Sequence, residues 1–329
     1  MPEHLEKALD LLSDLVLNPK LDPQDIEREK GVVLEEIAMV EDTPEDVVAD
    51  LAALADFGQT ALARPILGPS DNIKNASREA LLAYRQRLYT PKNAVIAVAG
   101  RYDRADLERL CQRFFGSWQG EAPSARSAYM PVEKRFLYRE KTIEQAHLCF
   151  GFDGVSMGDL RSYPMAVLNT YLGGGMSSRL FQTVREKLGL AYSVYSYPSN
   201  YEQCGVLTLY AGTSVANLPL VAEAIAREIH DVCQEGASKQ MLFKAKEQLR
   251  GSYILGQEST NARMMALGRA LLTHQPVRSM DQVLELIDAV TVDDVNHVMR
   301  LAFDSPMSVA LVSPENTIHP EQLEAIVRG

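Results

Sequence analysis

Residues 77–110 have the sequence SREALLAYRQRLYTPKNAVIAVAGRYDRADLERL, and a similar pattern returns near the other end of the chain. Residues 291–326 have the sequence TVDDVNHVMRLAFDSPMSVALVSPENTIHPEQLEAI. Both stretches predict a capped helix, a proline, a buried strand, a loop and a second helix. Pro91 aligns with Pro306, at an offset of 215 residues. Such a repeat predicts two copies of one fold, arranged as a pseudo-symmetric pair of domains.

The repeat also indicates that the first copy is the shorter one. The second copy begins near residue 140 with a predicted strand at 146–152, and the same offset would place its counterpart before Met1. The first domain would then lack about 70 residues, including a strand, a helix and a Gly-rich turn. We expect a truncated chain or a misplaced start codon. The alternative is a first copy that is naturally shorter.

Short strands alternate with helices along the chain, which predicts an α+β fold. Apolar runs predict buried strands at 94–100, 146–152 and 309–313. Two alternating runs, AYSVYSYPSNY and CGVLTLYAGT, predict an antiparallel hairpin. We therefore expect two homologous domains, each with a mixed, largely antiparallel sheet packed against helices, of which the first is incomplete.

The domain boundary falls where the composition changes. Residues 121–134, EAPSARSAYMPVEK, are rich in Ser, Pro and Ala and show no sustained period, which is typical of a linker. We expect a truncated N-terminal domain at 1–120 and a homologous C-terminal domain at 135–329.

Composition excludes several classes of protein. The 329 residues are 46% hydrophobic and 23% charged, as in ordinary globular proteins. The net charge of -11 argues against a nucleic-acid partner, which needs a basic face. No apolar run reaches the roughly 18 residues of a membrane helix, and the N-terminus lacks a signal-peptide layout. The four cysteines show no CxxC spacing and indicate a reducing compartment. We expect a cytoplasmic protein without a membrane partner.

Two carboxylates stand out on the long helix predicted from Asp22 to about Glu41. Glu29 and Glu36 are seven residues apart, close to two helical turns, so both point the same way. A carboxylate on the apolar side of a helix is costly unless it is paired or binds a metal. The alternative is a solvated acidic face. The repeat places Lys244 and Gly251 at the matching positions, so the pair belongs to one domain only.

A second pair lies in FQTVREKLGLAYSVY, where Arg185 and Tyr192 are also seven residues apart. A helix end near Gly189 places the pair across a helix and the start of a strand. A guanidinium and a phenol that converge could hold a peptide carbonyl and stabilise an oxyanion. The alternative is an ion pair of Arg185 with a neighbouring Glu. Gly173-Gly174-Gly175 follows a helix and fits a helix end with a tight turn, not a P-loop.

Five stretches together resemble the pitrilysin/insulinase-type metallopeptidases (the inverzincins), and specifically their bacterial subgroup similar to mitochondrial processing peptidase. They are PEHLEKALDLLSDLVLNPKLDPQDIEREKGVVLEEIAMVEDTPED, RPILGPSDNI, YTPKNAVIAVAG, LGGGMSSRLFQTVREKLGLAYSVYS and AKEQLRGSYILGQEST. They span nearly the whole chain in the order of the family.

The resemblance implies a zinc metalloendopeptidase that acts on extended peptides. In the family, an inverted HxxEH supplies two histidine ligands and a general-base Glu, and a distant Glu completes the Zn²⁺ site. The resemblance places Glu36 at that distal ligand and Glu29 at its supporting carboxylate. Arg185 and Tyr192 match the pair that contacts substrate near the scissile bond. Family members of this length pair, which implies a homodimer or a heterodimer with a homologous subunit.

This chain departs from the family pattern in one respect: none of its six histidines lies in an HxxEH. A catalytic zinc takes three protein ligands, so one Glu is too few. We expect the chain by itself to bind zinc poorly and to cleave nothing, although the retained pairs indicate descent from an active enzyme. One alternative is a non-catalytic peptide-binding or assembly subunit that pairs with a catalytic homologue. Another is a gene fragment that does not fold stably.

Overall fold

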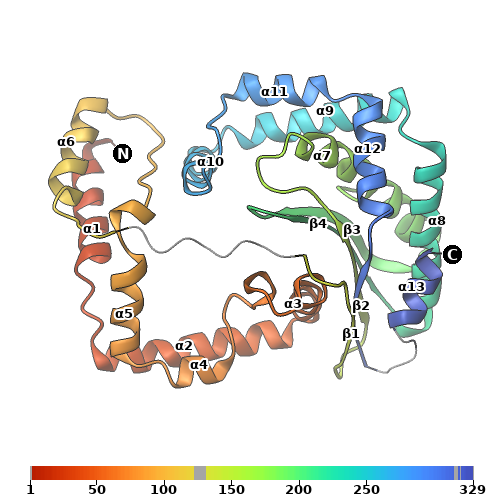
Figure 1. The fold of residues 1–329 in the computed structure, drawn as a ribbon, viewed down its shortest axis with the longest axis horizontal. Coiled ribbons are helices and arrows are strands. Elements are labelled where there is room, and N and C mark those ends of the chain that lie inside the picture. The colour runs from red at the N-terminus through yellow and green to blue at the C-terminus, as the bar shows by residue number, and fades with distance from the viewer. Residues whose placement is uncertain (1, 122–130, 315–317, 319, 329) are drawn as a thin grey trace. The chain divides into compact units, whose positions relative to one another are not determined.

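The computed structural model describes residues 2–121, 131–314, 318 and 320–328 (Figure 1). The chain divides into two compact units that do not follow chain order. Unit 1 contains Met1–Ile37, Leu67–Ser127 and Leu255–Val277. Unit 2 contains Ala38–Ile66, Ala128–Ile254 and Arg278–Gly329. The expected domains at 1–120 and 135–329 were inferred from the sequence repeat. The units defined by contacts do not test them, and they remain a prediction.

The described part of unit 1 is helical. Its helices are α1 (Leu5–Leu17), most of α2 (Pro23–Asp42), α4 (Ser70–Lys74), α5 (Arg78–Leu88), α6 (Arg104–Phe115) and α10 (Thr260–Leu272). Helix α1 packs against α6. Arg85 on α5 donates to the Val16 and Leu17 carbonyls, which are left without intrahelical partners at the end of α1.

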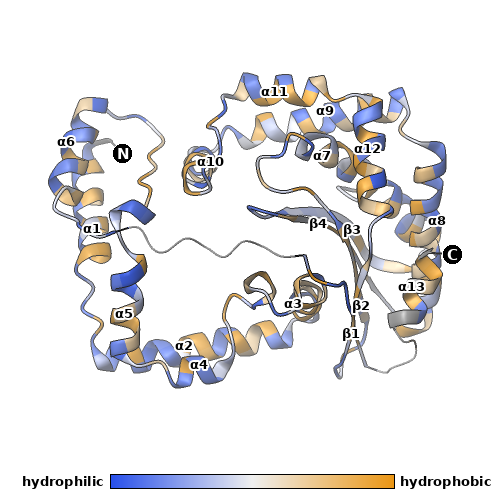
Figure 2. Ribbon diagram, viewed as in Figure 1, coloured by the Kyte–Doolittle hydropathy of each residue, from blue (hydrophilic) through white to orange (hydrophobic). Residues whose placement is uncertain are grey.

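Local sequence explains where the unit 1 helices begin. The Ser77 hydroxyl accepts from the Ala80 amide at 3.1 Å and caps α5. The Asp103 carboxylate accepts from the Asp106 amide at 2.9 Å and caps α6. Both colours run along α2 in Figure 2, as expected of a helix with one apolar side.

Unit 2 holds a five-stranded sheet in the order β1-β5-β2-β4-β3. Its strands are β1 (Phe136–Glu140), β2 (Ala146–Asp153), β3 (Ala191–Asn200), β4 (Gly205–Thr213) and β5 (Ser308–Ser313). Only β1 and β5 pair in parallel, and the other neighbours are antiparallel. The α+β class is thus confirmed, and so is the hairpin, which is β3–β4. The described residues form this one sheet, whereas we expected a sheet in each domain.

One face of the sheet carries the main core. The helices around this core are α7 (Ser162–Leu172), α8 (Leu218–Glu235), α9 (Lys239–Gly256), α11 (Met280–Ala289), α12 (Val292–Phe303) and α13 (Pro320–Arg328). Leu148, Phe150 and Leu311 on the strands pack into one cluster with Leu168 on α7 and Ile225 on α8, and all five are fully buried. This burial is the main source of stability of the unit.

The opposite face of the sheet is covered by α3 (Pro44–Phe57), which Figure 1 shows on the other side from α8 and α12. Val47, Val48 and Ala52 on α3 pack against Cys149, Tyr210, Ala310 and Val312. These strand residues alternate with those of the main core, as the pleat of a strand requires. Helix α3 comes from the first repeat but covers the sheet of the second.

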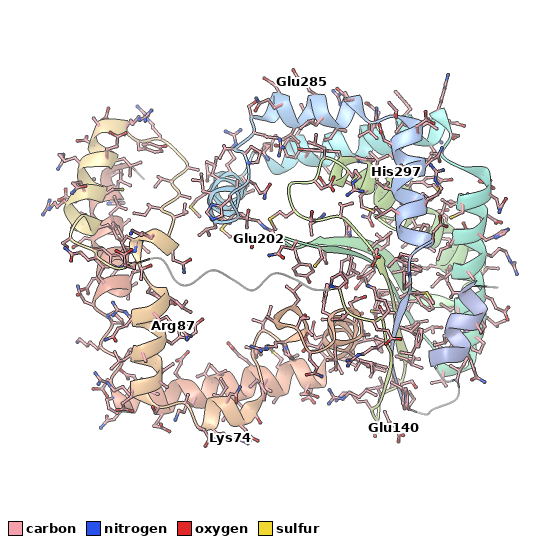
Figure 3. The ribbon with its side chains drawn as sticks, in the orientation of Figure 1. Lys74, Arg87, Glu140, Glu202, Glu285 and His297 are labelled. Atoms are coloured by element: carbon pink, nitrogen blue, oxygen red, sulfur yellow. The ribbon has the colours of Figure 1, made fainter. Side chains whose placement is uncertain are left out.

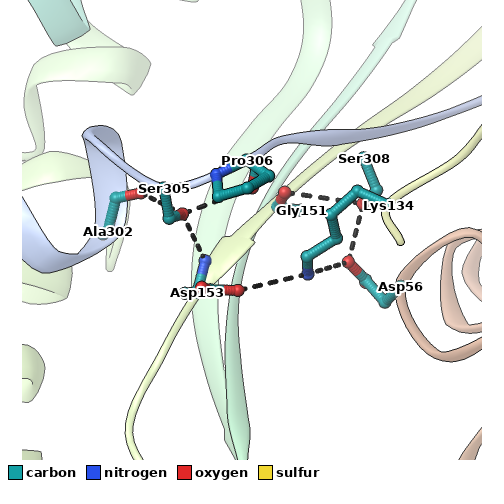
Figure 4. A network of polar contacts seen from close by, with 8 residues as sticks. All are labelled: Asp56, Lys134, Gly151, Asp153, Ala302, Ser305, Pro306 and Ser308. Carbon is teal, nitrogen blue, oxygen red and sulfur yellow. Dashed lines mark hydrogen bonds and ion pairs between the residues drawn. The ribbon is translucent and has the colours of Figure 1, made fainter. Parts of the chain in front are cut away.

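A buried polar network fixes the C-terminal end of α3 to the sheet (Figure 4). The Asp56 carboxylate lies 2.9 Å from the Lys134 ammonium and accepts a 2.6 Å hydrogen bond from the Ser308 hydroxyl. The same ammonium lies 3.6 Å from an Asp153 oxygen. Burial raises the pKa of Asp56, although the ammonium and the hydroxyl act against that rise.

The repeat is visible in the helices. Five helix pairs begin 213 to 216 residues apart, namely α1 and α8, α2 and α9, α3 and α10, α5 and α12, and α6 and α13. Helix α1 packs against α6 as α8 packs against α13. Helices α3 and α10 are counterparts, and each belongs to the unit that holds most of the other copy.

The strand predicted at 94–100 does not form in this structure. The segment makes no ladder pairing with the described strands, and its residues are exposed or half-buried. An apolar run becomes a strand only where neighbouring strands accept its backbone hydrogen bonds. Strand β1, which was not predicted, is short and half-buried.

Candidate functional site

Arg185 and Tyr192 are brought together in unit 2. Arg185 lies in the π-helical segment Phe181–Lys187, and Tyr192 lies at the start of β3. The centre of the Arg185 guanidinium is 5.4 Å from the centroid of the Tyr192 ring and 4.8 Å from that of Phe181. Both distances are within the range of cation–π attraction.

The alternative, an ion pair of Arg185 with a neighbouring Glu, is present as one long contact with Glu186. Among the residues that the structure describes, the only carboxylate near its guanidinium is that of Glu186, with Oε1 3.9 Å from Nε. The Arg185 side chain is 40% exposed. Its N–H groups are therefore available to an acceptor from another molecule. The phenol ring of Tyr192 is also accessible, since that residue is 72% exposed.

A cavity of about 450 Å³ opens beside the Arg185 side chain. It is lined by Arg185, by Phe181, by Tyr195 and other residues of β3, and by the turn Gly173–Gly175. Gly173 ends α7, as predicted, and its amide donates to the Asn169 carbonyl. A Cβ at Gly173 would lie 2.4 Å from the Ser196 amide nitrogen, so a larger residue would push the turn off β3.

Glu29 and Glu36 are both exposed on α2, and none of the residues of that helix is buried. Glu29 lines an apolar cavity of about 580 Å³ in unit 1, together with Ile26, Val33 and Leu81. In this structure the pair fits the solvated acidic face that spacing left open. Exposure leaves both carboxylates free to bind, and their roles as ligand and support remain predictions.

Sequence reasoning missed a polar cluster on the α3 face of the sheet. His147 Nδ1 is 2.8 Å from the Tyr210 hydroxyl, and that hydroxyl donates to Glu45 Oε1 at 3.0 Å. The Tyr195 ring stacks on the Tyr210 ring, with centroids 4.7 Å apart. Burial lowers the pKa of His147 and raises that of Tyr210. The available signal was a histidine inside an apolar strand, since such a residue needs a partner.

Comparison with known proteins decides the family. The family description "Insulinase (Peptidase family M16)" matches residues 1–70, and "Peptidase M16 inactive domain" matches residues 75–249. The chain is 39% identical over 320 residues to the uncharacterized zinc protease YmxG of Bacillus subtilis, covering 97% of this chain and 78% of that protein. The chain belongs to the M16 peptidase family. The predicted resemblance to insulinase-type peptidases is confirmed.

Other M16 relatives and solved structures agree. An uncharacterized zinc protease of Streptomyces coelicolor, SCO5738, is 37% identical, covering 94% of this chain and 69% of that protein. A Helicobacter pylori protease superposes with a TM-score of 0.85 at 18% identity, over 95% of this chain and 78% of that one. Complex III2 from Candida albicans gives a TM-score of 0.85 at 17% identity, over 99% and 81%. These structures show that the fold is shared.

The described residues do not bring together the ligands of a zinc site. Over the described ranges, no group of three or more His, Cys, Asp or Glu side chains lies close enough together to hold a metal. His297, for example, is exposed on α12 (Figure 3). A catalytic zinc takes three protein ligands. The relatives are named zinc proteases, whereas the described residues of this chain bring no such set of donors together.

The helices were compared with the length and apolar character of membrane-spanning helices. In the part of the chain that the structure describes, no helix combines the length and the apolar character that crossing a bilayer requires.

Proposed function

We propose that this chain provides the substrate-contacting half and one carboxylate ligand of an M16 zinc metalloendopeptidase that cleaves extended peptides. The observation that carries the proposal is the stacking of Arg185 on Tyr192 beside an open cavity. This arrangement combines accessible hydrogen-bond donors with a stacked aromatic surface.

The chemistry of the pair suits a peptide bond. The Arg185 guanidinium presents several N–H donors in one plane, and the Tyr192 hydroxyl adds another. Donors aimed at a carbonyl oxygen bind the peptide, and they bind more strongly once that oxygen gains negative charge. The stacked rings restrict the guanidinium, which lowers the entropy that binding would cost.

In this proposal Glu36 is the distal metal ligand and Glu29 its supporting carboxylate. The two histidine ligands would come from residues outside these 329, either on an extended chain or on another subunit of an assembly. The chain alone then binds no stoichiometric zinc. The expected assembly is a homodimer or a heterodimer with a homologous subunit.

A second candidate function follows from the same residues. The chain retains Arg185 and Tyr192 but has no HxxEH, which favours a non-catalytic subunit that presents this pair to the active site of a homologous peptidase. The two candidates differ in whether the in-frame DNA before Met1 encodes HxxEH. If it does, the peptidase is favoured, and if it encodes an in-frame stop, the partner subunit is.

The metal role is tested by zinc content and by cleavage of a quenched fluorescent peptide. The 329-residue chain should give neither. A version extended by any in-frame coding sequence should bind one zinc and cleave, and Glu36→Gln should reduce both by at least about tenfold, since each ligand of a catalytic site is needed. Glu35→Gln, at an exposed neighbour on α2, is the control. Unchanged zinc content in Glu36→Gln would remove Glu36 from the site.

The substrate role is tested without the metal. Affinity of the 329-residue chain for fluorescein-labelled, unfolded β-casein is measured by anisotropy. Arg185→Ala should weaken binding about 10- to 100-fold, as expected for hydrogen bonds from a charged group. Lys187→Ala, an exposed cation on the same segment, is the control. Equal losses in the two variants would indicate non-specific attraction and would contradict the proposal.

A further inference from the structure

Arg179 makes an ion-pair network just before the segment that carries Arg185. Its Nε lies 2.6 Å from Glu228 Oε2, and its Nη1 donates to Glu235 Oε2 at 2.8 Å. The same Nη1 donates to the Tyr171 hydroxyl at 3.2 Å. Tyr171 is on α7, and the two glutamates are on α8. One guanidinium therefore ties the start of the Arg185 segment to two helices.

The network is anchored in the protein interior. The Glu228 side chain is only 8% exposed, and a carboxylate so buried requires a charged partner. Leu180 and Val184, on either side of Phe181, are fully buried in the main core. The beginning of the segment is thus held by charge and by packing together.

Arg185 itself has no comparable anchor. Its described contacts are the rings of Phe181 and Tyr192 and the distant Glu186 carboxylate. Its direction depends on the backbone that presents it, which is π-helical from Phe181 to Lys187, with Leu188 N donating to the Thr183 carbonyl at 3.0 Å. A wide turn of this kind is rare and is often found at functional sites. Its orientation is set by what holds its ends.

We propose that Arg179 is a positioning residue for peptide binding, acting by fixing the start of the π-helical segment so that the Arg185 guanidinium faces the cavity. This inference rests on the proposed function, because it assumes that Arg185 contacts substrate. Arg179 does not line that cavity. Its effect on binding is therefore indirect, and the proposal is that it passes through Arg185.

Lysine cannot replace Arg179 in this role. The planar guanidinium reaches acceptors on α7 and α8 from two of its nitrogens. A lysine ammonium is one compact charge without the fixed planar fork, so it cannot place donors at both the Nε and the Nη1 positions. It can still neutralise Glu228, so Arg179→Lys keeps the charge and loses the geometry. That makes it a sharper variant than alanine.

The test is a double-mutant cycle on β-casein affinity, using wild type, Arg179→Lys, Arg185→Ala and the double variant. Each is first shown by thermal melting to be folded at the assay temperature. Arg179→Lys should weaken binding about tenfold in the wild-type background and less than about twofold in the Arg185→Ala background, because coupled residues do not add. The control is Arg227→Lys, at the exposed neighbour of Glu228.

Each outcome of the cycle has one meaning. Equal losses in both backgrounds, or no loss in the wild-type background, would overturn the positioning role.

If Arg185→Ala leaves affinity unchanged, the proposed function fails, and the positioning role is judged by NMR of the Arg185 Nε–H group. That signal should be sharp in wild type and broadened in Arg179→Lys; an unchanged signal would refute positioning. If Arg179→Lys does not fold, Glu235→Gln replaces it, with an expected loss of about two- to threefold.

Discussion

The same sequence pattern forms different structures in the two copies of the repeat. In the second copy, residues 309–313 belong to β5, which lies between β1 and β2. In the first copy the corresponding residues, from Ala94 onward, form no strand. Leu311 is fully buried, whereas Ile96, its counterpart at an offset of 215, is 45% exposed. An apolar run is therefore not sufficient for a strand, because the strand also needs at least one neighbouring strand to pair with its backbone groups.

The helices show the same contrast. In the second copy, α8 buries Val221, Ile225 and Val232 in the main core. In the first copy, its counterpart α1 leaves three leucines, Leu11, Leu12 and Leu15, more than half exposed. Helices α11 and α12 pack against α7 in unit 2, while the apolar cavity in unit 1 is lined by α1, α2, α4 and α5. In unit 2 these helices pack on a sheet and on α7. In the described part of unit 1, the similar helices have neither a sheet nor a counterpart of α7 to pack on.

The largest expected effect is a loss of stability at α3 that has no equivalent at its counterpart α10. Lys134→Met leaves the Asp56 carboxylate buried without its cation and should reduce the free energy of unfolding of unit 2 by about 3 to 5 kcal/mol at neutral pH. Hydrogen exchange of the β2 and β5 amides measures the loss. The control is Leu271→Ala, at the position of α10 that matches Asp56 at the offset of 215, where the side chain is 50% exposed and about 0.5 kcal/mol or less is expected. Comparable losses would show that the network does not anchor α3.

The next effect tests the two strand segments directly. Leu311→Ala should destabilise unit 2 by about 2 to 5 kcal/mol, because it leaves a cavity in a closely packed core. Ile96→Ala should cost less than about 1 kcal/mol, since that side chain is already partly in water. Urea unfolding followed by hydrogen exchange compares the pair. A loss at Ile96 that matches the loss at Leu311 would mean that the first segment is a buried strand after all.

The smallest effect concerns pH. Burial lowers the pKa of His147, so the folded state holds this side chain neutral while the unfolded chain takes up a proton near its ordinary pKa. This contribution to stability is present above about pH 6.5 and is lost as the pH falls below it. His147→Gln should flatten the decline in unfolding free energy of unit 2 between pH 7 and pH 5. His297→Gln, at an exposed histidine, should leave it unchanged, and equal slopes for all three proteins would refute the effect.

Sequence predicted best the features that depend on neighbouring residues. The helices, the cap at Ser77 and the β3–β4 hairpin each follow from patterns of residues that are close together in the sequence. The strand at 94–100 was wrong because strand formation depends on distant partners. The Asp56–Lys134 pair was missed for the same reason, since its residues are far apart in sequence and only folding brings them together.

The candidate site also has some features that residue spacing could indicate and others that it could not. Spacing singled out Arg185 and Tyr192 but left open whether they converge or Arg185 pairs with a neighbouring Glu, and the structure places the guanidinium against the ring. Spacing could not predict the π-helical segment, because its hydrogen bonds reach one residue further than those of an α-helix without a clear sequence signal. For Glu29 and Glu36, spacing gave a shared direction but not what they face, which depends on groups that other elements supply.

Helix α3 has a consequence for anyone who divides this protein. A fragment cut at the boundary between the repeats, beginning at residue 135, would keep all five strands but lose the helix that covers Cys149, Tyr210 and Ala310. The bared apolar face would make such a fragment prone to aggregate. A separate peptide spanning residues 38–66 should restore its solubility by covering this face. The C-terminal half would then need only this segment of the N-terminal half to be soluble.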